Sequence, residues 1–171
     1  MRYIGIDNGK DGAVVVIDET GRVLEKHVAT VIGDGKREYD VSAMVRILKP
    51  YEHSLVGGLT FSDGAFCWLE AAQAMPKQGV SSTFSIGLGY GLWQGILTAL
   101  GIPFATVRPR IWQDQMFRGI NHDDTKKASA LIASRLSPDT DWRASDRCKI
   151  PHDGLTDAYC IAEYGRCLQK G

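Results

Sequence analysis

The chain has 171 residues, 44% of them hydrophobic, and its 20 basic and 20 acidic residues give a formal net charge of zero. This length and composition suffice for one sizeable core, and we expect a single domain over residues 1–171. The neutral total charge by itself favours neither a nucleic-acid nor a membrane partner. The four cysteines include no CxxC pair, which argues against a zinc or redox motif and is typical of a cytoplasmic protein. A strand starts within a few residues of the N-terminus, so no signal peptide is expected.

Three segments at the start of the chain are rich in apolar and β-branched residues: 2–7, 13–18 and 22–31. The turn-forming sequences NGKDG and ETG separate them, so we predict a three-stranded antiparallel meander. A helical spacing of apolar residues follows over 40–51 and ends near Pro50. Residues 64–70 return to strand character and end at Glu70.

The second half of the chain alternates helices and strands. We predict a long helix over residues 82–100, a strand over 104–109, a short helix from Pro109 through Trp112, a helix over 123–136 and a last helix over 153–168. The most apolar stretch, residues 86–102, is short for a membrane span and contains five glycines, so we expect a buried helix and no membrane partner. Hairpin strands followed by this alternation predict an α/β domain with a mixed sheet.

An aspartate interrupts the apolar character of the first predicted strand. Because side chains alternate along a strand, Ile4 and Ile6 point to one face while Gly5 and Asp7 point to the other. Burying an unpaired carboxylate costs several kcal/mol on an order-of-magnitude scale. Asp7 is therefore expected to be paired, hydrogen-bonded or bound to a metal ion.

Three further acids occupy notable positions: Glu70 ends a later strand, and Asp153 and Asp157 stand on the last helix. The spacing of four residues places Asp153 and Asp157 on one helix face, where their repulsion favours a cation. Carboxylate oxygens suit magnesium or manganese. Taken alone, Asp153 is equally well explained as a helix cap, and Glu70 as a surface carboxylate at a strand exit. Together with Asp7, these acids form a candidate metal site.

Five blocks of the sequence resemble the RuvC-type Holliday junction resolvases, especially the phage-type proteins, in their order and spacing. The blocks are YIGIDNGKDGAVVVID, CWLEAAQAMPKQGVSSTFSIGLGYGLWQGIL, PFATVRPRIWQ, DDTKKASALIA and PHDGLTDAYCIAEYG. The resemblance implies a ribonuclease H-like α/β fold with a mixed five-stranded sheet flanked by helices. It also implies a homodimer that nicks symmetric strands of four-way DNA junctions with Mg²⁺, for which Mn²⁺ substitutes, in the cytoplasm of a prokaryotic, phage or viral setting.

Matched to this family block by block, Asp7, Glu70 and Asp157 take the positions of catalytic, metal-binding carboxylates. Many relatives carry two acids three residues apart on the last helix, whereas here the residue three before Asp157 is Gly154. Asp153, four before Asp157, keeps the same helical face and is the expected fourth ligand. Such a site needs no serine or cysteine nucleophile, because metal ions hold the attacking water and the leaving oxygen in line.

Acidic residues are absent between Ala71 and Gln113, which permits a local basic surface on a neutral protein. The resemblance suggests that Lys126 or Lys127 contacts a phosphate near the cleavage site, and a solvated helix face is the alternative. Backbone amides at the start of the long helix can also hold phosphate. The DNA-binding candidates are Lys77, Gly79, Ser81, Ser82, Arg108, Arg110, Lys126, Lys127, Arg147 and Lys149.

Two features of the long helix leave alternatives open. Gly87, Gly91 and Gly95 recur every four residues, and this stripe either packs against the protein's own sheet or forms a dimer interface. Resolvases of this type can use an aromatic residue soon after the strand-end glutamate to unstack bases. Here Gln73 stands third after that glutamate, and Phe84 is the candidate substitute.

Other functions compete with a junction resolvase. The opening GIDNGKDG also resembles the phosphate-binding turn of sugar and acetate kinases, but those chains are much longer and carry a second nucleotide loop that is not visible here. A nuclease with a broader preference for forks and flaps is one alternative. A catalytically silent junction-binding module is another, and the intact set of acids favours the enzyme over it.

Overall fold

The computed structural model describes residues 1–28, 31–32, 37–56, 59–61, 64–73, 78–120 and 123–170. Five strands form the central sheet: β1 (Arg2–Asp7), β2 (Ala13–Ile17), β3 (Val23–Val28), β8 (Ala65–Glu70) and β9 (Phe104–Val107). Their order is β3-β2-β1-β8-β9, antiparallel from β3 to β1 and parallel from β1 to β9. The predicted mixed five-stranded α/β sheet is therefore confirmed.

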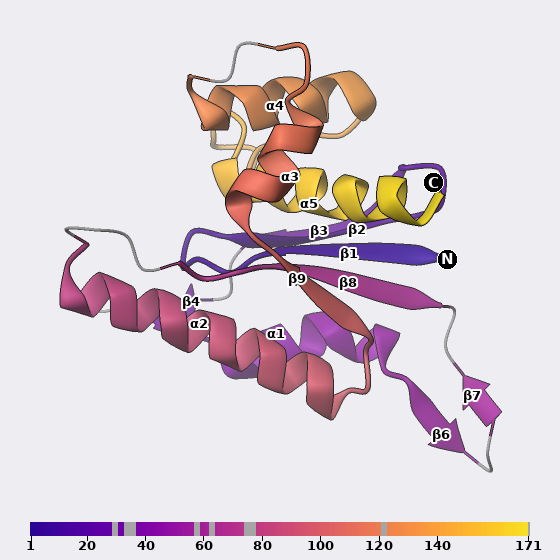
Figure 1. Ribbon diagram of the computed structural model, residues 1–171. Helices are drawn as coiled ribbons and strands as arrows, with labels where there is room; N and C mark the ends of the chain where they lie inside the picture. Colours follow the sequence, from indigo (N-terminus) through magenta and orange to yellow (C-terminus); the bar gives the residue numbers. More distant parts are fainter. Residues whose placement is uncertain are drawn as a thin grey trace.

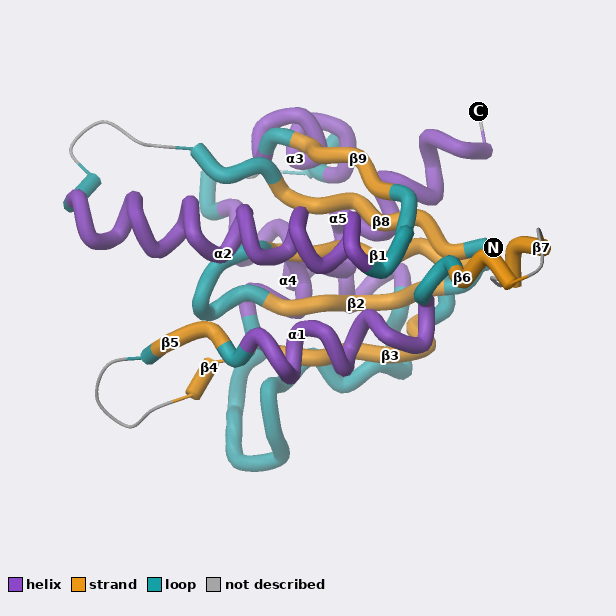
Figure 2. The backbone as a smooth tube through the Cα atoms, turned by 90° about the horizontal axis from the view of Figure 1, so that it is seen from below, coloured by secondary structure: helices purple, strands orange, loops and turns teal. Residues whose placement is uncertain are grey.

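Helices cover both faces of this sheet (Figure 1). The helices α1 (Val41–Leu48) and α2 (Val80–Ala99) lie side by side on one face, as Figure 2 shows, and the short 3-10 helix Lys49–Tyr51 extends α1. The other face carries α3 (Pro109–Met116), α4 (Thr125–Leu136) and α5 (Asp153–Lys170). In the described part of the chain, no helix combines the length and the apolar character needed to cross a bilayer.

Two small hairpins lie outside the central sheet. The strand predicted over residues 22–31 ends at Val28, and β4 (Val31–Ile32) instead pairs with β5 (Glu38–Tyr39). The Tyr39 hydroxyl anchors this hairpin by donating to the backbone carbonyls of Asn8 and Ser85, at 3.3 and 3.2 Å. The second hairpin, β6 (Ser54–Val56) and β7 (Leu59–Phe61), lies in a region for which no strand was predicted.

Strand alternation divides the core into two layers. Ile4 and Ile6 of β1 are fully buried against the α1 and α2 side, together with Leu69 of β8. The alternate positions of β1 face α5, and a Cβ atom at Gly5 would collide with the backbone carbonyl of Ala158. This absence of a side chain lets α5 lie directly on β1. Asp7, two residues after Gly5, therefore points toward the side of the sheet that α5 covers.

The glycine stripe of α2 does not pack against the sheet. Gly87, Gly91 and Gly95 are exposed, and among the described residues no atom outside the neighbouring backbone of α2 lies within 4 Å of the place that a Cβ would take at any of them. The buried side of the helix instead carries Trp93, Ile96 and Leu97, together with Gly89. Of the two explanations that the sequence left open for the stripe, packing on the protein's own sheet is therefore wrong.

Candidate active site

Asp7 and Glu70 end two neighbouring parallel strands. Ile6 of β1 pairs with Leu69 of β8, so the residue that follows each lies at the same edge of the sheet, at the left of Figure 1. Asn8, which is almost fully buried, joins the two strand ends by donating from Nδ2 to the Glu70 backbone carbonyl at 2.5 Å. One carboxylate oxygen of Asp7 accepts from the Gly9 amide at 3.2 Å. The indole Nε1 of Trp112 donates to Oε1 of Glu70 at 2.9 Å.

The first turns of α5 bring Asp153 and Asp157 to the same edge. A Cβ atom at Gly154 would collide with the backbone of Asp11 and Gly12, in the turn that follows Asp7. The helix therefore docks on this turn through its glycine, and no side chain fits at that position. This close approach explains why the acid stands four residues before Asp157 rather than three.

An open cleft of about 400 Å³ collects three of the four acids. Asp7, Asp153 and Asp157 line it, whereas Glu70 does not and lies beside it. Within the described residues, no three His, Cys, Asp or Glu side chains lie close enough to hold a metal ion as they stand. The oxygen donors suit a hard divalent cation.

Burial and mutual repulsion disfavour the ionised form of these acids. Burial, reinforced by the negative charges of Asp7 and Asp153, raises the pKa of Asp157 to about 7. Burial also raises the pKa of Glu70, with the charges of Asp7 and Asp157 acting in the same direction. Burial, and to a smaller extent the charges of Asp11 and Asp153, also raise the pKa of Asp7. Such a group of repelling carboxylates has the electrostatic character of a cation site.

No family model matches the sequence, and no curated protein matches it. Solved structures do match the fold. Thermus thermophilus RuvC in complex with a Holliday junction substrate superposes with a TM-score of 0.63 at 15% sequence identity, covering 100% of this chain and 97% of that one. A second structure of Thermus thermophilus RuvC gives a TM-score of 0.61 at 16% identity, with the same coverage of both chains.

The chain has a RuvC-like, ribonuclease H-like fold. The match covers the whole chain, including the strand ends and the helix that carry the four acids. The fold expected from the sequence resemblance is thereby confirmed.

The structure distinguishes the surroundings of Lys126 from those of Lys127, which the sequence could not do. Lys126 lines the cleft, and its Nζ lies 2.7 Å from a carboxylate oxygen of Asp153. Lys127 instead pairs with Asp124, the residue that caps α4, at 3.0 Å. Asp124 also accepts from the Lys127 backbone amide. Of the two, only Lys126 is placed to meet a group that enters the cleft.

The other DNA-binding candidates predicted from the sequence are spread around the cleft. Ser82 lines it, Ser81 lines an adjoining groove, and Gly79 caps α2 without a side-chain bond. Arg108 and Arg110 are exposed at the start of α3, where Arg110 lies 3.7 Å from Asp114. These two arginines do not line the cleft, and Lys77 lies outside the described residues.

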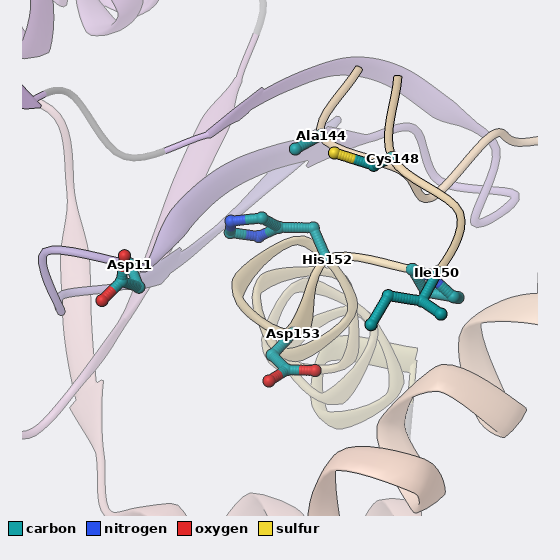
Figure 3. Close-up of a pocket in the computed structure, with 7 residues that line it drawn as sticks. Asp11, Ala144, Cys148, Ile150, His152 and Asp153 are labelled. Atoms are coloured by element: carbon teal, nitrogen blue, oxygen red, sulfur yellow. The ribbon is translucent and has the colours of Figure 1, made fainter. Parts of the chain in front are cut away.

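The loop between α4 and α5 forms a second, smaller pocket beside the cleft. Figure 3 shows Ala144, Cys148 and Ile150 around this pocket, whose volume is about 240 Å³. The His152 ring and the Asp153 carboxylate point in different directions there. Arg147 and Lys149 are exposed on the same loop and line neither the pocket nor the cleft.

Sequence reasoning missed several residues of the site. Lys10 and Tyr39 line the cleft, Asn8 joins the strand ends, and Trp112 contacts Glu70. Asn8 directly follows Asp7 and Lys10 stands three residues after it, so their position close to a strand-end acid was a usable signal. Nothing in the sequence marks Tyr39 or Trp112, because both reach the site through tertiary packing.

Asp157→Asn should stabilise the metal-free protein at high pH. The folded pKa of Asp157 lies above its ordinary value of 3.8, so the ionisation penalty is absent below about pH 4 and grows as the pH rises to about 7. At pH 8 we expect the variant to have a free energy of unfolding higher than wild type by roughly 1 to 4 kcal/mol, with little difference at pH 4. Urea unfolding with EDTA measures this.

Asp141→Asn is the matched control for that measurement. The hydrogen bonds from Arg143 hold the pKa of Asp141 well below its ordinary range, so removing this charge should not stabilise the protein at pH 8. Equal free energies of unfolding for wild type and Asp157→Asn at pH 8 would contradict the raised pKa of Asp157.

Proposed function

We propose that this chain, as one nuclease domain over residues 1–171, is a metal-dependent endonuclease that resolves four-way DNA junctions by paired symmetric nicks. The observation that carries the proposal is the acidic cleft where the end of β1 meets the start of α5, beside the end of β8, in a RuvC-like fold. A solved neighbour with this fold is a complex with a Holliday junction substrate. Charge and geometry support a site for a phosphodiester and a cation together.

The metal ligands in this proposal are Asp7, Glu70, Asp153 and Asp157, with Mg²⁺ as the ion and Mn²⁺ as a substitute. When bound, the metal would activate a water molecule and offset the charge that develops on the phosphate. Asp7 and Asp157 face the cleft from a strand and a helix that are packed rigidly together. The Lys126 ammonium is paired with Asp153 in this structure. When the substrate enters, the ammonium can exchange this partner for a phosphate oxygen.

DNA would enter across the open side of the cleft, between the start of α2 and the start of α4. Ser82 and Lys10 line the cleft on the α2 side, and the exposed Phe84 lines the adjoining groove. Lys126 stands on the α4 side. Phosphate contacts from Lys10, Ser82 and Lys126 would position a branched substrate without reading its sequence. The basic residues outside the cleft, Arg108, Arg110, Arg147 and Lys149, would contact more distant phosphates.

Symmetric nicking requires two active sites, and we propose that the chain forms a homodimer through the outer face of α2. Val80, Phe84 and Leu88 expose much of their apolar surface on this helix. The stripe of Gly87, Gly91 and Gly95 is open, so another helix can approach its backbone closely. Exposed apolar surface of this kind marks interaction sites more often than free surface.

A junction-binding module without cleavage is the second candidate. The observation that favours it is the spacing of the acids, which in the described residues do not form a ready metal site. A broader nuclease for forks and flaps differs from a resolvase only in its substrate preference. Cleavage assays on several DNA structures separate all three functions.

Asp7→Asn should abolish cleavage while sparing DNA binding. The substitution keeps the size of the side chain and removes one charged metal ligand, so the cleavage rate should fall roughly 100-fold or more. The assay incubates labelled four-way junction, forked DNA and linear duplex with Mg²⁺ and maps nicks on each strand. Asp141→Asn, an acid outside the cleft, should cut like wild type.

Each pattern of nicks in this assay has one meaning. Paired symmetric nicks in the junction alone support a resolvase, and equal cutting of junctions and forks identifies a broader nuclease. Tight binding without any cutting by the wild-type protein identifies the silent module. Full activity of Asp7→Asn would overturn the assigned role of Asp7.

Lys126→Ala should weaken the binding of junction DNA and its dependence on salt. One lost phosphate contact lowers the slope of log affinity against log salt concentration by roughly one unit. Lys127→Ala removes the same charge from the same turn of α4, but its side chain faces Asp124 rather than the cleft. Fluorescence anisotropy in EDTA at several salt concentrations should show the larger change for Lys126→Ala. Equal changes for the two variants would contradict the distinction between Lys126 in the cleft and Lys127 outside it.

Gly91→Cys should give a covalent dimer with a short bis-maleimide crosslinker if α2 forms the interface. The experiment uses a Cys167→Ser background, because Cys167 is the exposed native thiol. Lys127→Cys, on α4 at the opposite face of the sheet, is the control and should remain monomeric on a denaturing gel. Equal yields at both positions, or none at Gly91→Cys, would exclude this interface.

A further inference from the structure

A side-chain hydrogen bond between the Trp112 indole and the Glu70 carboxylate joins α3 to the strand-end acids. Nε1 of Trp112 donates to Oε1 of Glu70 at 2.9 Å. An indole nitrogen is only a donor, whereas an ionised carboxylate is only an acceptor. The indole is therefore always the donor in this hydrogen bond, and the acceptor is one of the two oxygens of Glu70.

Trp112 is held too firmly to follow a moving carboxylate. Its side chain is fully buried, and its ring meets the ring of Phe117 edge to face, with 5.6 Å between centroids and an angle of 78° between planes. Ile161 of α5 belongs to the same buried cluster. The direction of the N–H group is consequently set by the packing of α3 against α5.

The chain reaches this position by a short path from the strand beside Glu70. Val107 of β9 pairs with Glu70 of β8, and Pro109 then starts α3. Trp112 lies one helical turn after Pro109, which turns its side chain back over the end of β8. The same segment thus extends the sheet next to the acid and supplies the donor that holds its carboxylate.

We propose that Trp112 is a positioning residue that fixes the Glu70 carboxylate for metal binding. With Oε1 engaged by the indole, Oε2 is the oxygen left for a cation shared with the neighbouring acids. Loss of the indole N–H would let the Glu70 side chain turn away without changing the charge of the site. This inference rests on the proposed metal-dependent function and adds a residue that touches neither the metal nor the DNA.

Metal binding without DNA tests this role. In calorimetric titrations with Mn²⁺, Trp112→Phe should weaken binding roughly 10-fold relative to wild type, a typical cost of losing a group that orients a ligand. Trp142→Phe is the matched control, because Trp142 is also buried and packs on the ring of Tyr159, while its Nε1 has no hydrogen-bond partner in the described residues. The control should bind Mn²⁺ like wild type.

A second measurement observes the wild-type protein by NMR, so it does not depend on whether Trp112→Phe folds. The four tryptophans give four indole N–H resonances in a ¹⁵N-labelled sample. Selective labelling and Trp142→Phe assign the control resonance, and an ¹⁵N-edited NOE from Phe117 identifies Trp112. Titration with Mg²⁺ should shift the Trp112 resonance and leave that of Trp142 in place.

The outcomes distinguish this inference from the proposed function. If wild type binds Mn²⁺ and Trp112→Phe binds it equally well, or if the Trp112 resonance does not respond to Mg²⁺, Trp112 is only a core residue. If wild type binds neither ion, the proposed metal-dependent function fails, and the positioning role fails with it. Weaker binding by both variants to the same degree would identify a general packing defect and overturn the inference.

Discussion

The direct packing of α5 on β1 is the contact on which the candidate site depends. It requires two positions without side chains: Gly5, opposite the Ala158 carbonyl, and Gly154, against the turn after Asp7. A side chain at either glycine would push the helix away from the strand. Asp157 would then move away from Asp7, and the cleft that both line would widen.

Gathering these acids has a cost that the surrounding structure offsets only in part. Their charges repel, and burial removes water that would otherwise solvate them. Lys126 compensates Asp153, the Gly9 amide contacts Asp7, and the indole of Trp112 contacts Glu70. The raised pKa values show that compensation is incomplete without a cation. The repulsion lowers the stability of the folded protein at this site, where the positive charge of a bound metal ion would reduce it.

The two faces of the sheet contribute different parts of the structure: one buries apolar side chains, and the other carries the acids. The α1 and α2 side buries one continuous apolar layer that includes Ile4, Ile6 and Leu69. The α5 side supplies the acids, and its helices α3 and α4 bring Trp112 and Lys126 to the strand ends. At the far end of α5, Arg166 pairs with the buried Glu163 and also donates to the Glu19 carbonyl in the turn between β2 and β3. The bond from Arg166 to the Glu19 carbonyl joins the far end of α5 to this turn.

Local patterns in the sequence were sufficient for most of the fold. Alternation along the first strands, the caps of α4 and the positions of Pro109 and Glu70 predicted the mixed sheet and its helices, because each signal depends on neighbouring residues only. The small hairpins were missed or misplaced, since the Tyr39 hydroxyl that anchors β5 bonds to carbonyls far along the chain. The glycine stripe likewise had two explanations until the exposed face of α2 was known.

The sequence by itself determined which acids are available and on which elements they stand, because strand ends and helix spacing are local properties. Only the tertiary structure decided how they meet. It places Asp7, Asp153 and Asp157 in one cleft with Glu70 beside it, selects Lys126 over Lys127, and explains Gly154 by its contact with the Asp11 backbone. The contact of Trp112 with Glu70 also belongs to this second group. Such relations join residues that are distant in the chain, and their distances follow from packing rather than from spacing.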